Sequence, residues 1–460
     1  MSTIKQLISL SFLLLTTIVF AQPIEGTLNW YNQEGQGMHT EKAYKYLKKK
    51  KSETVIVGVI DSGVDIEHKD LEGQIWVNED EIPGNGIDDD NNGYIDDIHG
   101  WNFLGNAKGE NLNDARLEKT RILAQLKDKY DGIDPNSIQQ DDEYKLYLQV
   151  KEEVEGELEQ MNQYMEMVNS GMLGEDAQNY INSQVNYNLN VDFDDRSLIG
   201  DDPDDFSDKN YGNNNVEGPD ALHGTHVSGI IGALRGNELG GDGVAENVKI
   251  MSLRAVPNGD EFDKDIAFAV RYAVDNGAMV INMSFGKAYS PHQKEVYEAF
   301  KYADERGVLL IHAAGNDAKD IDVEPNYPTS MYSFQTEPLD HFVTIGASTR
   351  HEGEALVASF SNFGSKGVDV FAPGYEIWNA VPQSEYMNLQ GTSMAAPMVA
   401  GAAAMLKSYF PKLSMKEIKD AMYSTSTKYK VEGFAEKSVT GGVINIYEAA
   451  KACKKLSKKK

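Results

Sequence analysis

The sequence predicts an α/β protein with a doubly wound, mostly parallel sheet flanked by helices. The first observation is a continuous β-branched run, "TVIVGVI" (54–60), which is typical of a strand buried on both faces of a parallel sheet. The second is a regular alternation of strand-like and helix-like segments after residue 220. The third is composition: 41% of the 460 residues are apolar and 25% are charged, as in soluble globular proteins.

Short apolar runs predict the strands, and longer segments with helical periodicity predict the helices. The expected strands are 54–60, 248–256, 278–286, 308–316, 342–348 and 368–374. The expected helices are 40–51, 223–234, 263–277, 292–307 and one that begins near 392. Repetition of strand and helix favours a parallel core joined by helical crossovers.

The N-terminal segment 1–21 is interpreted as a signal peptide. Lys5 supplies a positive start, 7–21 an apolar run, and Ala21 a small residue before a cut ahead of Gln22. A membrane anchor is the alternative, but the run is short for a span. We therefore expect export to the periplasm or the medium, without a stable membrane anchor.

Composition divides the rest of the chain into three parts. Segment 22–104 is the first part of the main domain and contains an acidic loop, and 210–460 is its remainder. Between them, 105–209 is polar, acidic and helix-prone, which predicts a helical insertion, in the form of a hairpin packed on the main domain. Polar helices of this kind are most often solvated packing units.

The formal charge of −29 makes the surface repel phosphates and anionic lipids, so we expect no nucleic acid partner. The only cysteine, Cys453, excludes an internal disulfide. An exported chain without disulfides needs another source of stability, and bound calcium is a common one. We expect a monomer.

Three reactive side chains fall where strands should end or helices begin. Asp61 follows the first core strand, His223 begins a helix, and Ser393 begins the helix of "GTSMAAP" (391–397). Each has an ordinary alternative role, as a turn cap, a polar helix start and an N-cap. Together they supply the carboxylate, base and hydroxyl that acyl transfer requires. The small residues around Ser393 would give a substrate backbone access to the hydroxyl.

Acyl transfer also needs a donor for the tetrahedral oxyanion. Asn316 ends the strand-like "IHAAGND" (311–317), and its amide could act together with the backbone N–H of Ser393. The alternative role is an ordinary turn residue after glycine.

Five motifs resemble those of the subtilisin-like serine peptidases (subtilases, peptidase S8 family) and stand in the same order. They are "VIDSGVD" (59–65), "HGTHVSG" (223–229), "INMSFG" (281–286), "AAGN" (313–316) and "GTSMAAP" (391–397). The resemblance covers about 40–104 and 210–450. It implies that Asp61 orients the base His223, that Ser393 is the nucleophile and that Asn316 is the oxyanion donor; His226 is then structural.

The same resemblance implies where a protein or peptide substrate binds. Ser284, Phe285 and Gly286 would form an edge that pairs with extended peptide backbone, and Ala313, Ala314 and Gly315 would wall the first specificity pocket. Segment 257–262 resembles the opposite edge. Asp260 and Glu261 in that segment suggest a preference for basic, or at least non-acidic, residues upstream of the cut.

Two departures from the family pattern stand out. Met398 occupies a position where histidine is common, which leaves the chemistry unaffected. Only about thirty residues separate the expected cut from the first core strand, fewer than the family's usual propeptide. Either the enzyme folds without a pro-domain, or the insertion takes over part of that role.

The acidic loop "GIDDDNNGYIDD" (86–97) predicts a calcium site. Asp88, Asp90, Asn92 and Asp96 supply side-chain oxygens at alternate positions, and Tyr94 would supply its carbonyl. The twelfth position holds His99, so a further ligand must come from elsewhere, and Asp97 is one candidate. The alternative is a solvated acidic loop.

We therefore expect an exported, calcium-supported serine endopeptidase that acts through an acyl-enzyme. Three rivals are a non-catalytic relative that only binds, a hydrolase of other esters or amides, and a calcium-dependent surface adhesin.

Overall fold

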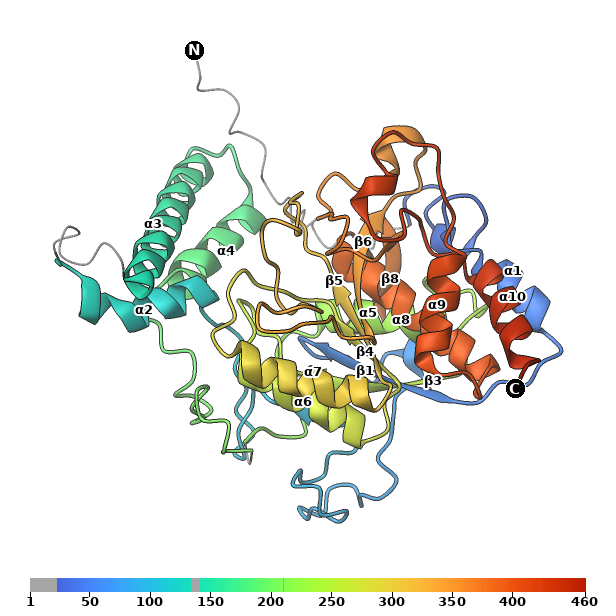
Figure 1. Cartoon of the computed structure of the whole chain (residues 1–460). Helices are drawn as coiled ribbons and strands as arrows, with labels where there is room; N and C mark the ends of the chain where they lie inside the picture. The colour runs from blue at the N-terminus through green and yellow to red at the C-terminus, as the bar shows by residue number, and fades with distance from the viewer. Residues whose placement is uncertain (1–22, 134–140, 210) are drawn as a thin grey trace.

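The computed structural model describes residues 23–133, 141–209 and 211–460 (Figure 1). The predicted signal segment 1–21 lies outside the described residues. Along the described chain, no helix combines the length and apolarity that crossing a membrane requires.

A seven-stranded sheet forms the centre of the molecule, with all neighbouring strands parallel. Its order is β2-β3-β1-β4-β5-β6-β7. The strands are β1 Val55–Asp61, β2 Gly100–Asn102, β3 Val248–Arg254, β4 Val280–Met283, β5 Leu309–Ala313, β6 Phe342–Ser348 and β7 Val370–Pro373. This confirms the predicted fold class. The short strand β2 and a separate antiparallel hairpin, β8 Ile377–Val381 with β9 Glu385–Leu389, were not predicted.

The described helices lie on both faces of this sheet and beyond it (Figure 1). They are α1 Thr40–Leu47, α2 Glu118–Tyr130, α3 Asp142–Asn169, α4 Glu175–Ser183, α5 Leu222–Gly232, α6 Asp263–Asp275, α7 Gln293–Glu305, α8 Thr392–Tyr409, α9 Met415–Ser424 and α10 Ile446–Ser457. Helices α6 and α7 cover one face, and α5 and α8 cover the other.

Strand β1 shows why the central run is apolar throughout. Successive side chains of a strand point to opposite faces of the sheet. Val57 and Val59 join the core under α5 and α8, whereas Ile60 joins the core under α6 and α7. Because both faces are covered, neither set of side chains reaches water.

Helix α8 lies directly on the sheet because its side chains are small. Ala395, Ala396, Ala402 and Ala403 are all fully buried in the core that α8 shares with the strands. The close approach places the first turn of α8, and with it Ser393, near the carboxyl ends of the central strands.

The segment predicted as an insertion contains α2, α3 and α4, which lie to one side of the main body (Figure 1). These helices have a small apolar core of their own, in which Ile122 and Leu123 of α2 meet Tyr144, Val150 and Val154 of α3. Although the segment is polar overall, α2 and α3 therefore each have an apolar side that packs against the other helix. The described part of the segment is a group of three helices, more than the predicted hairpin.

Candidate active site

The residues with catalytic chemistry meet at the carboxyl edge of the sheet. Asp61 is the last residue of β1, Ser284 follows β4 directly, and Asn316 lies three positions after β5. His223 and Ser393 lie in the first turns of α5 and α8. The carboxyl ends of parallel strands share one edge, where open α/β sheets place their sites.

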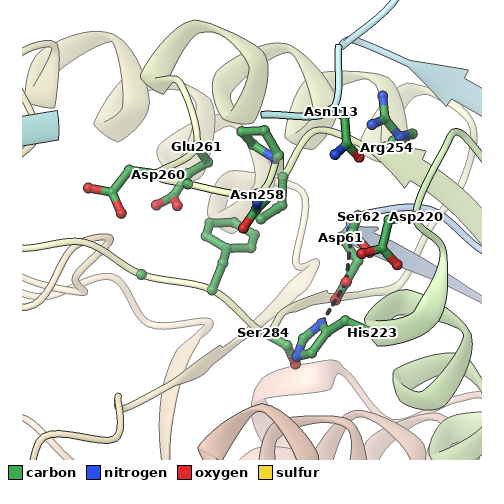
Figure 2. A pocket seen from close by; sticks show the side chains of 15 residues that line it. Asp61, Ser62, Asn113, Asp220, His223, Arg254, Asn258, Asp260, Glu261 and Ser284 are labelled. Carbon is green, nitrogen blue, oxygen red and sulfur yellow. Dashed lines mark hydrogen bonds and ion pairs between the residues drawn. The ribbon is translucent and has the colours of Figure 1, made fainter. Parts of the chain in front are cut away.

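Asp61 and His223 are joined by a hydrogen bond of 2.7 Å between Oδ1 and Nδ1 (Figure 2). Asp61 is 2% exposed, and the same oxygen accepts the N–H of Ser62 at 2.8 Å. The His223 side chain is 37% exposed. The carboxylate therefore holds the imidazole from behind, while the ring faces a cleft.

The environment of His223 favours a protonated imidazole. Burial by itself lowers the pKa of His223, but the charge of Asp61 and its hydrogen bond more than offset this, and the pKa is raised above its ordinary value. The charge of Asp220 adds to the increase. Such an imidazole is a stronger base than a free one.

Ser393 is half-buried and is fixed by Ser284 through two reciprocal hydrogen bonds. Its Oγ donates to the Ser284 carbonyl at 3.1 Å, and the Ser284 hydroxyl donates to the Ser393 carbonyl at 2.9 Å. Among the described side chains, no hydrogen bond joins Ser393 to His223. His223 and Ser284 nevertheless line the same cleft.

Asn316 is exposed and is oriented by Thr392. Its Oδ1 accepts the backbone N–H of Thr392 at 2.9 Å and the Thr392 hydroxyl at 3.1 Å. With the oxygen held in this way, the NH₂ group is left to donate elsewhere.

Gly391 leaves space between Asn316 and Ser393. A methyl group placed on Gly391 would lie 3.5 Å from Asn316 Nδ2 and 3.6 Å from the backbone nitrogen of Ser393. The two N–H donors therefore border one small space, which glycine keeps open for a third atom. Two converging donors of this kind suit a developing oxyanion.

The central cleft has a volume of about 320 Å³ (Figure 2), and its lining includes Asp61 and His223 but neither Ser393 nor Asn316. Asp61 and His223 line one end of it, and Asp260 and Glu261 line the other. Ser284, Phe285 and Gly286, which were predicted to bind substrate, also line it.

Gly286 offers free backbone groups at this edge. The Phe285 carbonyl accepts a hydrogen bond from His312 at 2.9 Å, and Lys287 pairs with Tyr327 through both backbone groups. Across the described chain, no hydrogen bond occupies the N–H or carbonyl of Gly286. Gly286 is exposed, so both groups are available to an added strand.

The predicted pocket wall after β5 is largely buried. Ala313 is 3% exposed and Ala314 is not exposed, while Gly315 donates its N–H to Thr392 Oγ1 at 3.0 Å. The residues that line the central cleft do not include these three. Gly315 instead contacts Thr392, the residue that orients Asn316.

The predicted insertion packs against the opposite edge of the cleft, segment 257–262. This contact was not predicted from the sequence. Asn258 donates its N–H to the Asn113 carbonyl at 2.7 Å and accepts from the Ala115 N–H at 3.0 Å. The stretch around 113–115 carries no strand-like pattern, so no local signal indicated this pairing.

Asp260 and Glu261 are engaged within the protein. Asp260 Oδ2 accepts the backbone N–H of Glu118 at 2.7 Å. Glu261 is 3% exposed, and burial raises its pKa to about 8, so near neutral pH it is mostly uncharged. This does not favour the predicted attraction of Glu261 for basic substrate residues.

His226 is unsuited to act as a base. It is fully buried, and its Nε2 lies 3.1 Å from the Ile377 carbonyl and 3.2 Å from the Met387 carbonyl. Burial lowers its pKa to about 3, so the ring stays neutral. Its contacts tie α5 to the hairpin β8–β9, which agrees with a structural role.

The acidic loop brings together three carboxylates that can hold a metal ion. One oxygen from each of Glu81, Asp90 and Asp97 lies within 4.8 Å of the others. Asp97 is fully buried, and this burial, together with the charge of Asp90, raises its pKa. Asn78 and Asn92 point their amides at these carboxylates, at 3.0 Å.

Only Asp90 of the predicted ligands belongs to this cluster, which also contains Asp97, the predicted candidate for a further ligand. Asp88 accepts the N–H groups of Asn92 and Gly93, and Asp96 accepts those of Asn85 and Gly86. The Tyr94 ring packs against Trp101 and Tyr272. Glu81 was not predicted because it precedes the alternating run, and only the folding of the loop brings it close to Asp90.

Comparisons with known proteins agree with this architecture. The model of the subtilase family matches residues 52–441. A thermophilic serine proteinase of Bacillus sp. (strain AK1) is 37% identical over 228 residues, which cover 49% of this chain and 51% of the relative. A cell wall-associated protease of Bacillus subtilis (strain 168) is 34% identical, over 52% of this chain and 24% of the relative. The chain thus spans about half, or less, of the length of these relatives.

Two further matches bear on the fold. Subtilisin Savinase of Lederbergia lenta is 36% identical over 208 residues, which cover 45% of this chain and 70% of the relative. The solved structure of a protease from Pseudoalteromonas arctica PAMC 21717 matches with a TM-score of 0.54 and 20% identity, over 94% of this chain and 100% of that one. Since the family model covers most of the sequence, including every strand of the central sheet, the chain belongs to the subtilase family.

Proposed function

We propose that this protein is a serine endopeptidase that hydrolyses peptide bonds through an acyl-enzyme. The observation that carries the proposal is the 2.7 Å hydrogen bond between Asp61 and His223, in the cleft that is bordered by Ser284, the partner of Ser393. Membership of the subtilase family and the serine proteinases among the relatives support it.

The reaction begins when the Ser393 hydroxyl leaves the Ser284 carbonyl by rotation about its Cα–Cβ bond and turns to His223 Nε2. The imidazole takes the proton as Oγ attacks the substrate carbonyl, and Asp61 stabilises the imidazolium through Nδ1. The oxyanion enters the space beside Gly391, between Asn316 Nδ2 and the N–H of Ser393. His223 then returns the proton to the leaving amine, and water hydrolyses the acyl-enzyme by the same route.

Protein and peptide chains are the proposed substrates. An extended peptide can pair with the free N–H and carbonyl of Gly286 as an added strand. An ester without a peptide backbone would gain nothing from this edge. This favours peptide hydrolysis over the hydrolysis of small esters.

We also propose that the acidic loop binds a structural calcium ion. Glu81, Asp90 and Asp97 provide the carboxylate oxygens that calcium prefers, and a cation would relieve their mutual repulsion. The Asn78 and Asn92 amides point at the same place, and each carries an oxygen that rotation of the amide exchanges for the nitrogen. The residues therefore fit calcium, whose charge would stabilise the loop.

We also propose that segment 1–21 directs export and that 105–209 is a separate insertion. The name of the cell wall-associated relative is consistent with action outside the cytoplasm.

The decisive experiment is labelling with a fluorophosphonate probe, which reacts only with an activated serine. Wild type should be labelled at Ser393, as located by mass spectrometry, and should digest casein, whereas Ser393→Ala should do neither. Lack of labelling in folded wild type would contradict the proposal. Labelling with ester turnover but no cleavage of casein or peptides would favour a non-peptide hydrolase.

A further inference from the structure

A second, larger groove lies between the predicted insertion and the main domain; we call it the insertion groove. Its volume is about 1030 Å³. One wall comes from α2 and α3, and the other from segments 286–293 and 317–327. Gly286 and Asp260 line both this groove and the central cleft. The two hollows therefore adjoin at the edge to which the substrate is proposed to pair.

A buried ionic network fixes the two walls relative to each other. Lys287, the residue after Gly286, places its Nζ 2.7 Å from Glu118 Oε2 and 2.8 Å from Asp263 Oδ1. Arg121 of α2 pairs with Glu118 at 2.6 Å. All of these groups are buried. Because breaking a buried network leaves uncompensated charge, the groove has a defined width.

The wall formed by α2 and α3 includes the apolar residues Ile122, Leu126 and Leu146. The lysines at the rim of the groove already have carboxylate partners: Lys119 pairs with Glu157 at 2.5 Å, and Lys319 with Glu324 at 3.3 Å. The groove therefore presents no surplus of positive charge to a ligand.

Glu153 belongs to the α2–α3 wall and has no cationic partner among the described residues. Its Oε1 accepts the Tyr289 hydroxyl at 2.8 Å and the Gln149 amide at 3.0 Å. Tyr289 belongs to the opposite wall, so this hydrogen bond crosses the groove. The arrangement holds a half-buried carboxylate in place beside apolar surface.

We propose that the insertion groove binds the part of a polypeptide substrate that precedes the residues held in the central cleft, and that Glu153 selects a Lys or Arg side chain there. This rests on the proposed function and on the expectation that Asp260, which lines both hollows, lies on the side upstream of the cleaved bond. The occupant follows from Gly286, which both hollows share, since a strand that pairs there can extend into the groove. Charge complementarity with Glu153 defines the preferred side chain, and the apolar residues of the α2–α3 wall accommodate its neighbours.

The test uses three internally quenched peptides with the same four residues on each side of the cleaved bond. One has no extension, and two carry a five-residue N-terminal extension that contains leucines and either lysine or glutamate. For wild type we expect kcat/KM to be about tenfold higher with the lysine extension than without an extension, which is the effect of one charge-assisted hydrogen bond. The glutamate extension should give no increase in kcat/KM. The lysine gain should decrease between 50 and 300 mM salt.

Glu153→Gln should bring the lysine-to-glutamate ratio close to one, and Tyr289→Phe, which frees Glu153, should reduce it in part. Glu159→Gln is the matched control, because Glu159 is exposed on the same helix and does not line the groove. Equal kcat/KM for all three peptides in wild type, or an unchanged ratio in Glu153→Gln, would overturn the proposal.

Failure of the proposed function would be recognised separately. Fluorescence anisotropy with Ser393→Ala measures binding of the same peptides without turnover. Tighter binding of the lysine-extended peptide, lost in Ser393→Ala combined with Glu153→Gln, would support the groove even if wild type cleaved nothing. Equal affinities for all three peptides would refute it, and concentration-dependent dimerisation that is abolished by Leu146→Asp would instead make a second copy the occupant.

Discussion

His223 Nδ1 lies 2.7 Å from Asp61 Oδ1, although 162 positions separate the two residues in the sequence. The carboxylate is buried and the imidazole reaches the cleft. A carboxylate behind the ring fixes the proton on Nδ1, which leaves Nε2 free to act as the base. The charge of this pair also determines where His223 titrates.

The pH dependence of kcat/KM should follow His223. Only the neutral imidazole accepts the serine proton, so activity should rise with pH through the raised pKa of His223, with a midpoint above the ordinary 6.5. In Asp61→Asn the charge is lost and burial remains, so the midpoint should move to lower pH. The wrong tautomer should also reduce kcat by roughly 10⁴. Rate profiles with one short peptide between pH 5 and 10 measure both effects.

If the midpoint of the rise in kcat/KM with pH does not shift in Asp61→Asn, His223 does not control the rate. Far-UV circular dichroism of the variant across the same pH range serves as the folding control.

Loss of the Asn316 amide should lower kcat far more than it changes KM. The amide is proposed to bind the oxyanion, which exists only after attack, so Asn316→Ala should reduce kcat by roughly 10²–10³. Gly391→Ala should have a similar effect, because its methyl group would lie 3.5 Å from Asn316 Nδ2, in the space left for the oxyanion. Steady-state kinetics on one peptide measure both variants. A rise in KM with unchanged kcat would instead assign Asn316 to ground-state binding.

Removal of calcium should lower the melting temperature. An ion present at a hundred times its Kd stabilises the folded state by about 2.7 kcal/mol, which corresponds to roughly 3 °C for a chain of 460 residues. Differential scanning calorimetry with EDTA, and after calcium is restored, measures the change.

The calcium effect should be much smaller in Asp97→Asn and in Glu81→Gln, because each removes a carboxylate from the cluster. Asp80→Asn is the control, since Asp80 is exposed and lies outside the cluster. A calcium response that both cluster variants retain would place the ion elsewhere.

Glu118→Gln should destabilise the protein by about 3–5 kcal/mol, because Lys287 and Arg121 would keep buried charges with fewer partners. Urea unfolding at pH 7 measures this. Glu448→Gln, which breaks the exposed pair with Lys451, should cost less than about 1 kcal/mol.

The Glu118 effect should depend on pH in a defined direction. Burial raises the pKa of Glu118, but Arg121 and Lys287 outweigh it and lower the pKa from 4.5 to about 2. The folded-state pKa is depressed, so the stabilisation is complete above pH 4.5 and is lost as pH falls toward 2. The difference between wild type and Glu118→Gln should shrink over that window. A constant difference would show that the carboxylate charge is not what stabilises the network.

The local sequence predicted most strands of the central sheet and the candidate catalytic residues of this protein. Runs such as 54–60 predict buried strands because both faces of a parallel strand need apolar side chains, and β1 confirms this. Asp61, His223 and Ser393 were identifiable because each stands in a short motif at the end of an element. Periodicity and motifs act over a few residues, so one sequence is enough to detect them.

Only the tertiary structure decided which distant groups meet. Lys287 and Glu118 lie 169 positions apart, and no local pattern indicates that their buried charges neutralise each other. The same holds for Glu81 joining Asp90, for Asn113 pairing with Asn258, and for Glu261, whose burial makes it mostly uncharged. Burial and ion pairing depend on the environment that the whole chain creates, and that environment is absent from any short stretch of it.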